Sequence, residues 1–373
     1  MKIVVALDKF KGSLTASRAC DIVRDALLSV RPGLRVVTKP MADGGDGTDE
    51  VLLTTLGGEW ITLPVMGPLP EMSCSARYAW LAKEATAVIA MANASGLVLL
   101  RPEQRNPLLT TTYGTGELIR AAIERGARHI WLAVGGSGTV DGGVGAAMAL
   151  DWRFLDVHGK PIGFGGGELE RIARIERPSK LLVPAVEVLC DVDNPLCGEH
   201  GAARVFGPQK GATPAMVERL DRGLRHLGRL VNEQLGRDIV NVPGAGAAGG
   251  LAGGALAFMD ARITSGIETV IRVSGIDVEL ADSDWVVTGE GRFDRQSLRG
   301  KVVSGVAKLA AKHGVKVAVL AGSVQVSEEI CRREGVELVL PTMKPGMELN
   351  EALERAEELL ASAARELAAR IAN

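Results

Sequence analysis

Seven short clusters of glycine, hydroxyl-bearing and charged residues recur along this 373-residue sequence. Glycine lets the backbone approach a ligand closely, and a carboxylate beside it can bind a hard cation or accept a proton. The clusters span residues 8–13, 43–48, 111–117, 135–143, 190–195, 206–211 and 288–294. This combination is more typical of polar-ligand chemistry than of core packing.

Carboxylates are concentrated in three of the clusters. Asp43 lies in a Gly-rich turn, where a capped helix start is the simpler interpretation. Asp191 and Asp193 follow a predicted strand, and strand alternation would point both side chains to the same side. Glu290 and Asp294 lie after another apolar run. Paired acids of this kind suit Mg²⁺ ligation or proton abstraction.

Other clusters are rich in hydrogen-bond donors. Residues 135–143 contain five glycines and two hydroxyl groups, which fits a phosphate cradle, although a tight packing turn is the alternative. Lys210 lies between Pro208 and Gly211, and the simpler interpretation is a solvated lysine. Residues 111–117 have a helix cap as their alternative, and residues 8–13 a plain strand–helix turn.

The composition excludes several classes of protein. Apolar residues make up 46%, charged residues 24%, and the net charge is −2 with both signs interspersed, so we expect no nucleic-acid partner. The five cysteines are scattered, which argues against a disulfide framework or a zinc site. We expect no membrane span, because the longest charge-free apolar run, residues 245–259, is too short. The N-terminus reaches a charge too soon for a signal peptide, so a cytoplasmic location is expected.

The elements that would position these clusters follow from hydrophobic periodicity. Short apolar runs predict strands at residues 3–7, 34–37, 60–65, 74–80, 88–92, 130–134, 187–190, 285–288, 315–320 and 336–340. Helical spacing predicts helices at residues 15–30, 48–56, 116–125, 216–235, 302–313, 328–334 and 351–371.

The order of these elements predicts an α/β fold of two domains. Strands and helices alternate at both chain ends, which favours parallel pairing with right-handed crossovers. The middle is mixed, and residues 60–65 and 74–80 alternate as in an antiparallel layer. We therefore expect a Rossmann-like parallel-sheet domain from residues 1–60 plus 281–373, with an inserted mixed α/β domain at residues 61–280. Six of the seven clusters then lie at strand ends or helix starts, where open α/β sheets bind ligands.

One segment matches a dinucleotide-binding fingerprint. Residues 244–249 fit the pattern GxGxxG, and Glu268 lies about twenty residues further on. The segment before Glu268 is a poor second strand for a βαβ unit, so a Gly- and Ala-rich helix that packs closely on its neighbours is the favoured interpretation. A nicotinamide oxidoreductase stays open as a rival class on this motif.

Taken together, the motifs resemble the bacterial glycerate kinase family, the type that phosphorylates D-glycerate at its 2-hydroxyl. The resemblance extends in order over nearly the whole chain. The matching segments are Asp8 to Leu14, Ala42 to Thr48, Tyr113 to Ile119, Cys190 to Leu196, Gly201 to Ala212, Ala245 to Leu251 and Thr288 to Gln296. Two positions depart from the family pattern: Asp46 stands where Glu is usual, and Val140 where Asn is usual.

The resemblance implies an ATP-dependent glycerate 2-kinase, with ATP and Mg²⁺ as cofactors and a cleft between the two domains as the site. Alignment and charge neutralisation would dominate catalysis, with a carboxylate guiding the proton of the nucleophile. We expect Asp191 in that role, and Lys11 and Lys210 beside the substrate carboxylate or the phosphates. Residues expected to bind substrate or phosphate are Asp8, Ser13, Asp43, Gly44, Gly45, Gly135, Gly136, Ser137 and Arg292. Residues expected to bind the metal are Asp193, Glu290 and Asp294.

Some alternatives stay open at this stage. A non-catalytic sensor of sugar acids or nucleotides is a second rival, distinguished by ligand binding without phosphoryl transfer. The sequence does not indicate which hydroxyl is phosphorylated, which domain binds adenine, or which of the loop acids is the base. D-Glycerate and ATP are the expected small-molecule partners, and a homodimer is left open.

Overall fold

The computed structural model describes residues 1–180, 183–295, 297–298 and 300–371. The chain divides into two compact units. Unit 1 comprises Met1–Asp43, Glu50–Leu56 and Ser265–Asn373, and unit 2 comprises Gly44–Asp49 and Gly57–Thr264. We had expected boundaries near residues 60 and 280, so residues 265–280 lie with the first unit and the short segment 44–49 with the second. The predicted α/β class is confirmed.

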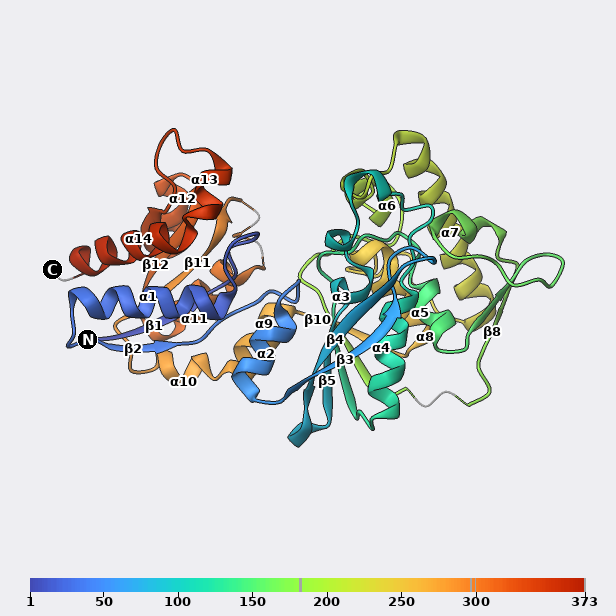
Figure 1. Ribbon diagram of the computed structural model, residues 1–373, viewed down its shortest axis with the longest axis horizontal. Helices are drawn as coiled ribbons and strands as arrows, with labels where there is room; N and C mark the ends of the chain where they lie inside the picture. The colour runs from blue at the N-terminus through green and yellow to red at the C-terminus, as the bar shows by residue number, and fades with distance from the viewer. Residues whose placement is uncertain (181–182, 296, 299, 372–373) are drawn as a thin grey trace. The chain divides into compact units, whose positions relative to one another are not determined.

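Unit 1 is built on a five-stranded, all-parallel sheet (Figure 1). Its strands are β1 (Lys2–Leu7), β2 (Arg35–Thr38), β11 (Trp285–Phe293), β12 (Lys316–Val324) and β13 (Val336–Pro341), in the order β13-β12-β11-β1-β2. The central strand β1 is buried along its whole length, as expected for a β-branched run covered on both faces.

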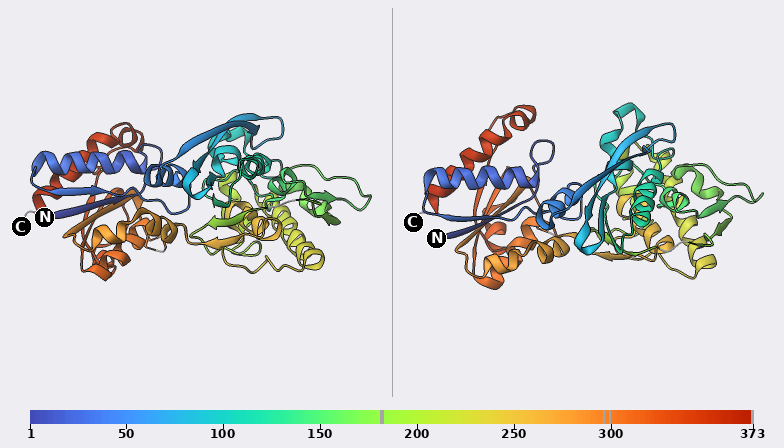
Figure 2. Two further views of the ribbon diagram at one scale, coloured as in Figure 1. Left: turned by 90° about the horizontal axis from the view of Figure 1, so that it is seen from below. Right: turned by 60° about the horizontal axis from the view of Figure 1, so that its bottom comes forward.

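Helices cover both faces of this sheet (Figure 2). The helices of unit 1 are α1 (Ala16–Val30), α9 (Gly266–Ser274), α10 (Ile276–Leu280), α11 (Val302–His313), α12 (Glu328–Arg333), α13 (Leu349–Glu354) and α14 (Ala356–Arg370), together with most of α2 (Thr48–Leu56). α1 and α14 pack together on the face that Ile3, Val5 and Leu7 present, and share one apolar core with them. α11 packs on β11 and β12, with α9 and α10 beside it.

Two predictions for the C-terminal part were wrong. We expected β11 to stop at Thr288, but it continues to Phe293, because its backbone stays paired in parallel with β12 as far as Val324. A Cβ atom on Gly289 would lie 1.8 Å from the carbonyl oxygen of Leu320, so glycine permits this close pairing. The single final helix predicted at residues 351–371 is two helices, α13 and α14, that meet at Arg355.

Unit 2 contains a six-stranded mixed sheet in the order β10-β9-β6-β5-β4-β3. The strands are β3 (Glu59–Met66), β4 (Ser73–Leu81), β5 (Thr86–Ala90), β6 (His129–Ala133), β9 (Ala185–Leu189) and β10 (Arg262–Thr264), and a separate hairpin pairs β7 (Arg153–Leu155) with β8 (Arg174–Glu176). The expected antiparallel pairing of β3 with β4 is confirmed. The strands β5, β6, β9 and β10 are parallel, so their carboxyl ends share one edge of the sheet.

The helices of unit 2 form its second layer with a large aliphatic core. They are α3 (Ala92–Ser95), α4 (Tyr113–Glu124), α5 (Val144–Ala149), α6 (Ala202–Phe206), α7 (Pro214–Leu235) and α8 (Leu251–Phe258). The predicted apolar stripe of α7 is buried, and Thr213 caps its first turn through Met216 N. Within the described residues, no helix combines the length and apolar character that crossing a bilayer requires.

The GxGxxG segment lacks the strand that a dinucleotide fingerprint needs before it. It forms a tight turn in which Ala248 and Gly249 have positive φ. A Cβ atom on Gly246 would lie 2.2 Å from the carbonyl oxygen of Pro195, and one on Gly249 would lie 2.0 Å from that of Thr139. The glycines therefore serve close packing against neighbouring loops, as the favoured interpretation predicted.

Candidate active site

In unit 1, the carboxylates of Asp8, Asp43 and Glu290 lie near the point where the strand order of the sheet reverses. From β1 the chain proceeds to β2 on one side, whereas β11, β12 and β13 follow each other on the other side. Such a switch point is where open α/β sheets bind ligands. Asp8 directly follows β1, and its N–H donates to the carbonyl oxygen of Gly289 in β11 at 2.9 Å. The segment after β2 stays beside β1 through the bond from Met41 N to Leu7 O at 2.9 Å, which leads Asp43 towards Asp8.

These acids disturb one another electrostatically. Burial raises the pKa of Asp8 well above its ordinary value, the charge of Asp43 raises it further, and a hydrogen bond from Lys9 N partly opposes them. Burial also raises the pKa of Glu290, against the lowering effects of Ser297 and Lys301. Among the described residues, the buried Oε1 atom of Glu290 has no hydrogen-bond partner. This atom of Glu290 is therefore available to a proton or a cation.

Three other predicted residues of unit 1, Lys11, Ser13 and Arg292, are exposed. Lys11 and Ser13 are exposed in the turn after β1, and Ser13 Oγ donates to Phe10 O at 3.1 Å. Arg292 lies on β11, not in the loop that we expected, and its exposed side chain contacts Asp294 Oδ2 at 2.9 Å. The side chains of Lys11 and Arg292 are thus accessible to an anion.

In unit 2, two glycine-rich loops contact each other backbone to backbone. A Cβ atom on Gly135 would lie 2.5 Å from Gly45 Cα and 2.7 Å from Asp46 N. Gly136, with φ of +70°, lies beside the Cβ of Asp46. The clusters at residues 43–48 and 135–143 are therefore brought together, as a shared site requires. Gly44, with φ of +82°, occupies a conformation that favours glycine.

The loop after β6 is anchored by the loop after β5. Leu97 N donates to Gly136 O at 2.8 Å, and Gly138 N donates to Ser95 O at 2.9 Å. These bonds hold residues 136–138 in place at the carboxyl edge of the parallel strands. Ser137 is partly exposed at the centre of the loop.

Lys210 is fully buried, contrary to the simpler interpretation of a solvated lysine. Its Nζ donates to Thr139 O at 2.7 Å and lies 2.7 Å from Ser137 Oγ. Burial lowers its pKa to about 7, and the charge of Asp141 acts in the opposite direction. The Lys210 side chain therefore contacts the glycine-rich loop at residues 135–143 directly. The sequence did not reveal this contact.

Asp141 organises the interior beneath that loop. Its carboxylate accepts hydrogen bonds from Thr112 N at 2.7 Å, Thr112 Oγ1 at 2.9 Å, Gly143 N at 3.1 Å and Gly145 N at 3.3 Å. Burial nevertheless raises the pKa of Asp141. In the cluster at residues 111–117, Thr112 thus holds Asp141, and within the described residues it makes none of the side-chain capping bonds to α4 that the alternative of a helix cap would need.

Asp191 and Asp193 lie in the loop after β9, on the same sheet edge as the loop after β6. β9 ends at Leu189, so no strand alternation orients the two side chains together as we expected. Asp191 is partly buried and Asp193 is exposed. Among the described residues, no three His, Cys, Asp or Glu side chains form a metal-binding group.

The two departures from the family pattern differ in consequence. Val140 is fully buried in the core of unit 2, so in this chain its side chain contributes packing. Asp46 is exposed beside Gly136, in the contact between the two glycine-rich loops.

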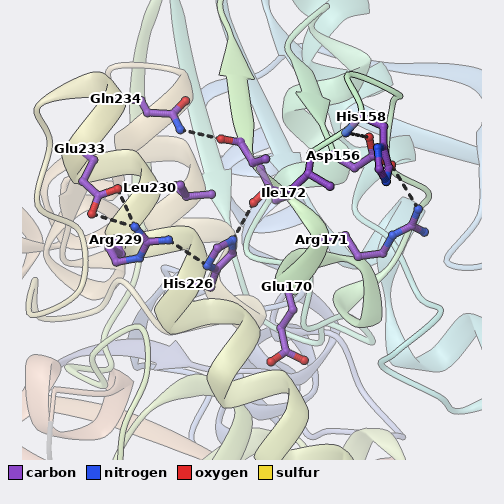
Figure 3. Close-up of a pocket in the computed structure, with 12 residues that line it drawn as sticks. Asp156, His158, Glu170, Arg171, Ile172, His226, Arg229, Leu230, Glu233 and Gln234 are labelled. Carbon is purple, nitrogen blue, oxygen red and sulfur yellow. Dashed lines mark hydrogen bonds and ion pairs between the residues drawn. The ribbon is translucent and has the colours of Figure 1, made fainter.

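A separate cavity of about 680 Å³ lies in unit 2, between α7 and the segments around β7 and β8 (Figure 3). The His226 Nε2 atom contacts Ile172 O at 2.7 Å, and Arg229 contacts Glu233 at 2.7 Å. The cavity is lined by none of the residues that we predicted for the site.

A parallel sheet with acids at its switch point, together with glycine-rich loops at the strand ends of the second unit, is typical of α/β enzymes that bind small polar ligands. The pattern of the glycerate kinase family matches residues 3–372. The chain belongs to the glycerate kinase family.

Individual relatives agree with this assignment. The chain is 43% identical to a glycerate kinase of Halalkalibacterium halodurans, over 98% of this chain and 97% of the relative. It is 41% identical to the glycerate 2-kinase of Escherichia coli, over 100% and 98% of the two chains. The crystal structure of a putative glycerate kinase 2 from Salmonella typhimurium LT2 superposes with a TM-score of 0.86 at 40% identity, covering 100% of this chain and 98% of that one.

Proposed function

We propose that the protein transfers the γ-phosphoryl group of ATP to the 2-hydroxyl of D-glycerate, giving 2-phosphoglycerate and ADP. The relative in Escherichia coli bears the name glycerate 2-kinase, which supports the choice of hydroxyl. The observation that carries the proposal is the group of acids Asp8, Asp43 and Glu290 at the switch point, because phosphoryl transfer needs carboxylates to manage protons and cations.

The chain supplies groups for each part of the reaction. Loops 44–45 and 135–137 offer backbone N–H groups to phosphate or carboxylate oxygens. The exposed cations Lys11 and Arg292 would neutralise negative charge on the substrates. Asp191, partly buried at the carboxyl edge of its sheet, would accept the proton of the attacking hydroxyl.

Mg²⁺ fits the acids of unit 1. Glu290 Oε1 is buried and lacks a hydrogen-bond partner within the described chain, and burial raises the Glu290 pKa, with a smaller contribution from the charge of Asp43. Kinases commonly bind Mg²⁺ through one or two carboxylates plus substrate phosphates, so a group of three protein ligands is not required. Glu290 would hold the ion with Asp43 or Asp294, and the bound ion would neutralise phosphate charge. Asp193, the third predicted ligand, is an exposed side chain and belongs to unit 2.

The reaction is tested by phosphorus NMR of the product formed from ATP and D-glycerate. A resonance of 2-phosphoglycerate is expected, and 3-phosphoglycerate would refute the proposed position. Asp191→Asn should lower turnover at saturating substrates about 10²-fold or more. The matched control is Asp260→Asn, an exposed acid outside all seven clusters. Turnover of Asp191→Asn within a few-fold of that control would remove Asp191 from the role of base.

The cleft between the two domains, the cytoplasmic location and a homodimer stay predictions.

A further inference from the structure

Lys210 has an unusual position for a lysine of a phosphoryl-transfer enzyme. Its side chain is fully buried, and its Nζ points at two atoms of the loop after β6, Ser137 Oγ and Thr139 O, each at 2.7 Å. It does not extend towards solvent, where an anionic substrate arrives. Any effect on a ligand must therefore pass through the loop.

The two contacts of Lys210 Nζ differ in whether the amine must be the hydrogen-bond donor. A carbonyl oxygen only accepts hydrogen bonds, so Lys210 always donates to Thr139 O. A serine hydroxyl donates or accepts, and among the described residues Lys210 is the one side chain with which Ser137 Oγ forms a hydrogen bond. The direction of the bond between Ser137 and Lys210 is thus free to follow the protonation of the amine.

Protonation then decides what Ser137 presents to solvent. A protonated Lys210 donates to Ser137 Oγ, which leaves the hydroxyl proton available for an anion. A neutral Lys210 has two N–H donors and one lone pair, and through the lone pair it would accept the hydroxyl proton of Ser137. The lone pairs of the Ser137 oxygen would then face outward, where they repel an anion. Ser137 is partly exposed within the Gly-rich loop, so either orientation reaches a ligand.

We propose that Lys210 is a positioning residue that reverses the Ser137 hydroxyl, so that this loop binds the anionic groups of the substrates well only while Lys210 is protonated. The proposal deepens the function proposed above and rests on it for the identity of the ligand. It assigns Lys210 an indirect role, in place of the direct neutralisation of substrate charge that the sequence suggested.

The surroundings of Lys210 support a change of protonation at ordinary pH. Burial lowers its pKa to about 7, and the charge of Asp141, which accepts hydrogen bonds from Thr112 N and Gly143 N, opposes this shift. Arg204 of the adjacent α6 is paired with Glu218 at 2.7 Å. Arg105 approaches the same turn through its carbonyl oxygen, next to Gly211.

The sign and size of the effect follow from the fraction of protonated Lys210. With a pKa of about 7, this fraction falls from about nine-tenths at pH 6 to about one-tenth at pH 8. If only the protonated form binds, the dissociation constant of an anion rises about tenfold over this range.

The test measures binding of D-glycerate and of sulfate to the full chain by calorimetry from about pH 6 to 8, a range over which neither anion changes its charge. The wild type should lose affinity about tenfold for an anion bound at the loop. Ser137→Ala should bind weakly and without this pH dependence. Thr139→Val is the matched control: it removes a buried hydroxyl that has no partner in the described chain, and keeps the carbonyl, so its pH dependence should equal the wild type's. Lys210→Arg, where it folds by circular dichroism, should keep tight binding at the upper pH.

The outcomes separate this inference from the proposed function. Glycerate phosphorylation without a Ser137-dependent pH response for either anion overturns the inference and leaves the function standing. A Ser137-dependent response to sulfate in a protein that does not phosphorylate glycerate supports the inference and removes the function. A pH response that persists in Ser137→Ala also overturns it, because another group then titrates.

Discussion

The contact between the two glycine-rich loops of unit 2 can be tested by adding a single methyl group. Gly135→Ala places a Cβ atom 2.5 Å from Gly45 Cα and 2.7 Å from Asp46 N. Both neighbours are backbone atoms, so no side-chain rotation relieves the overlap. The φ angle of Gly135 is not in the left-handed region, so the substitution tests the contact and adds no backbone strain of that kind.

The magnitude follows from the overlap. Ordinary contact begins at 3.4 Å, so one loop must move by about 1 Å relative to the other. Overpacking of this kind costs about 1–3 kcal/mol of stability, against a total of roughly 5–15 kcal/mol, so the protein stays folded. A displacement of about 1 Å in a group that positions a substrate lowers turnover about a hundredfold.

The assay couples ADP release to NADH oxidation, with melting temperatures measured in parallel. Gly163→Ala is the matched control, because Gly163 is exposed in the same unit and its nearest neighbour, Glu168 Oε2, would lie at 3.4 Å. We expect wild-type kinetics for the control and a kcat/KM about a hundredfold lower for Gly135→Ala. If Gly135→Ala kept more than about a third of the wild-type kcat/KM, the loop contact would not position reacting groups.

Two further predictions concern the acids of unit 1. Burial and the charge of Asp43 raise the pKa of Asp8, so the stability present below its ordinary pKa is lost as pH rises through the raised folded value. Asp8→Asn should therefore have a higher melting temperature than the wild type at neutral pH, and should lose this advantage in acid, where both side chains are neutral. The variant should also lose phosphoryl transfer. A gain in melting temperature of the same size at every pH would contradict the electrostatic explanation. Glu290→Gln should raise the Mg²⁺ concentration for half-maximal turnover at least about tenfold, whereas the exposed Glu328→Gln should not change it. An unchanged Mg²⁺ requirement in Glu290→Gln would exclude Glu290 as a ligand.

Much of the fold could be predicted because its signals are local. The β-branched run of β1 and the capped, amphipathic α1 each carry their pattern within a few residues. The end of β11 could not be predicted, because Gly289 is typical of a loop and becomes part of a strand only through its pairing with Leu320. The break between α13 and α14 falls at Arg355, with no glycine or proline to indicate it.

The candidate site likewise contains residues whose placement could be predicted from the sequence and residues whose placement could not. Asp8 and Asp43 follow predicted parallel strands, so the rule for strand ends was enough to expect them together. The direction of Lys210 depends on Ser137, which lies 73 residues away, and on burial that no local pattern encodes. Residues 190–195 were correctly expected after a strand, but the loop that they form leaves the side-chain directions of Asp191 and Asp193 to tertiary contacts.

The central place of β1 in its sheet has a consequence for the order of folding during synthesis. Ile3 pairs with Trp285, so β1 leaves the ribosome about 280 residues before the strand with which it pairs. The segment Gly57–Thr264, by contrast, is continuous and emerges before β11. Because domains fold as units during translation and distant pairing is slow, unit 2 should form first, while the apolar residues of β1 stay exposed. That strand is therefore the part of the nascent chain for which a chaperone would matter most.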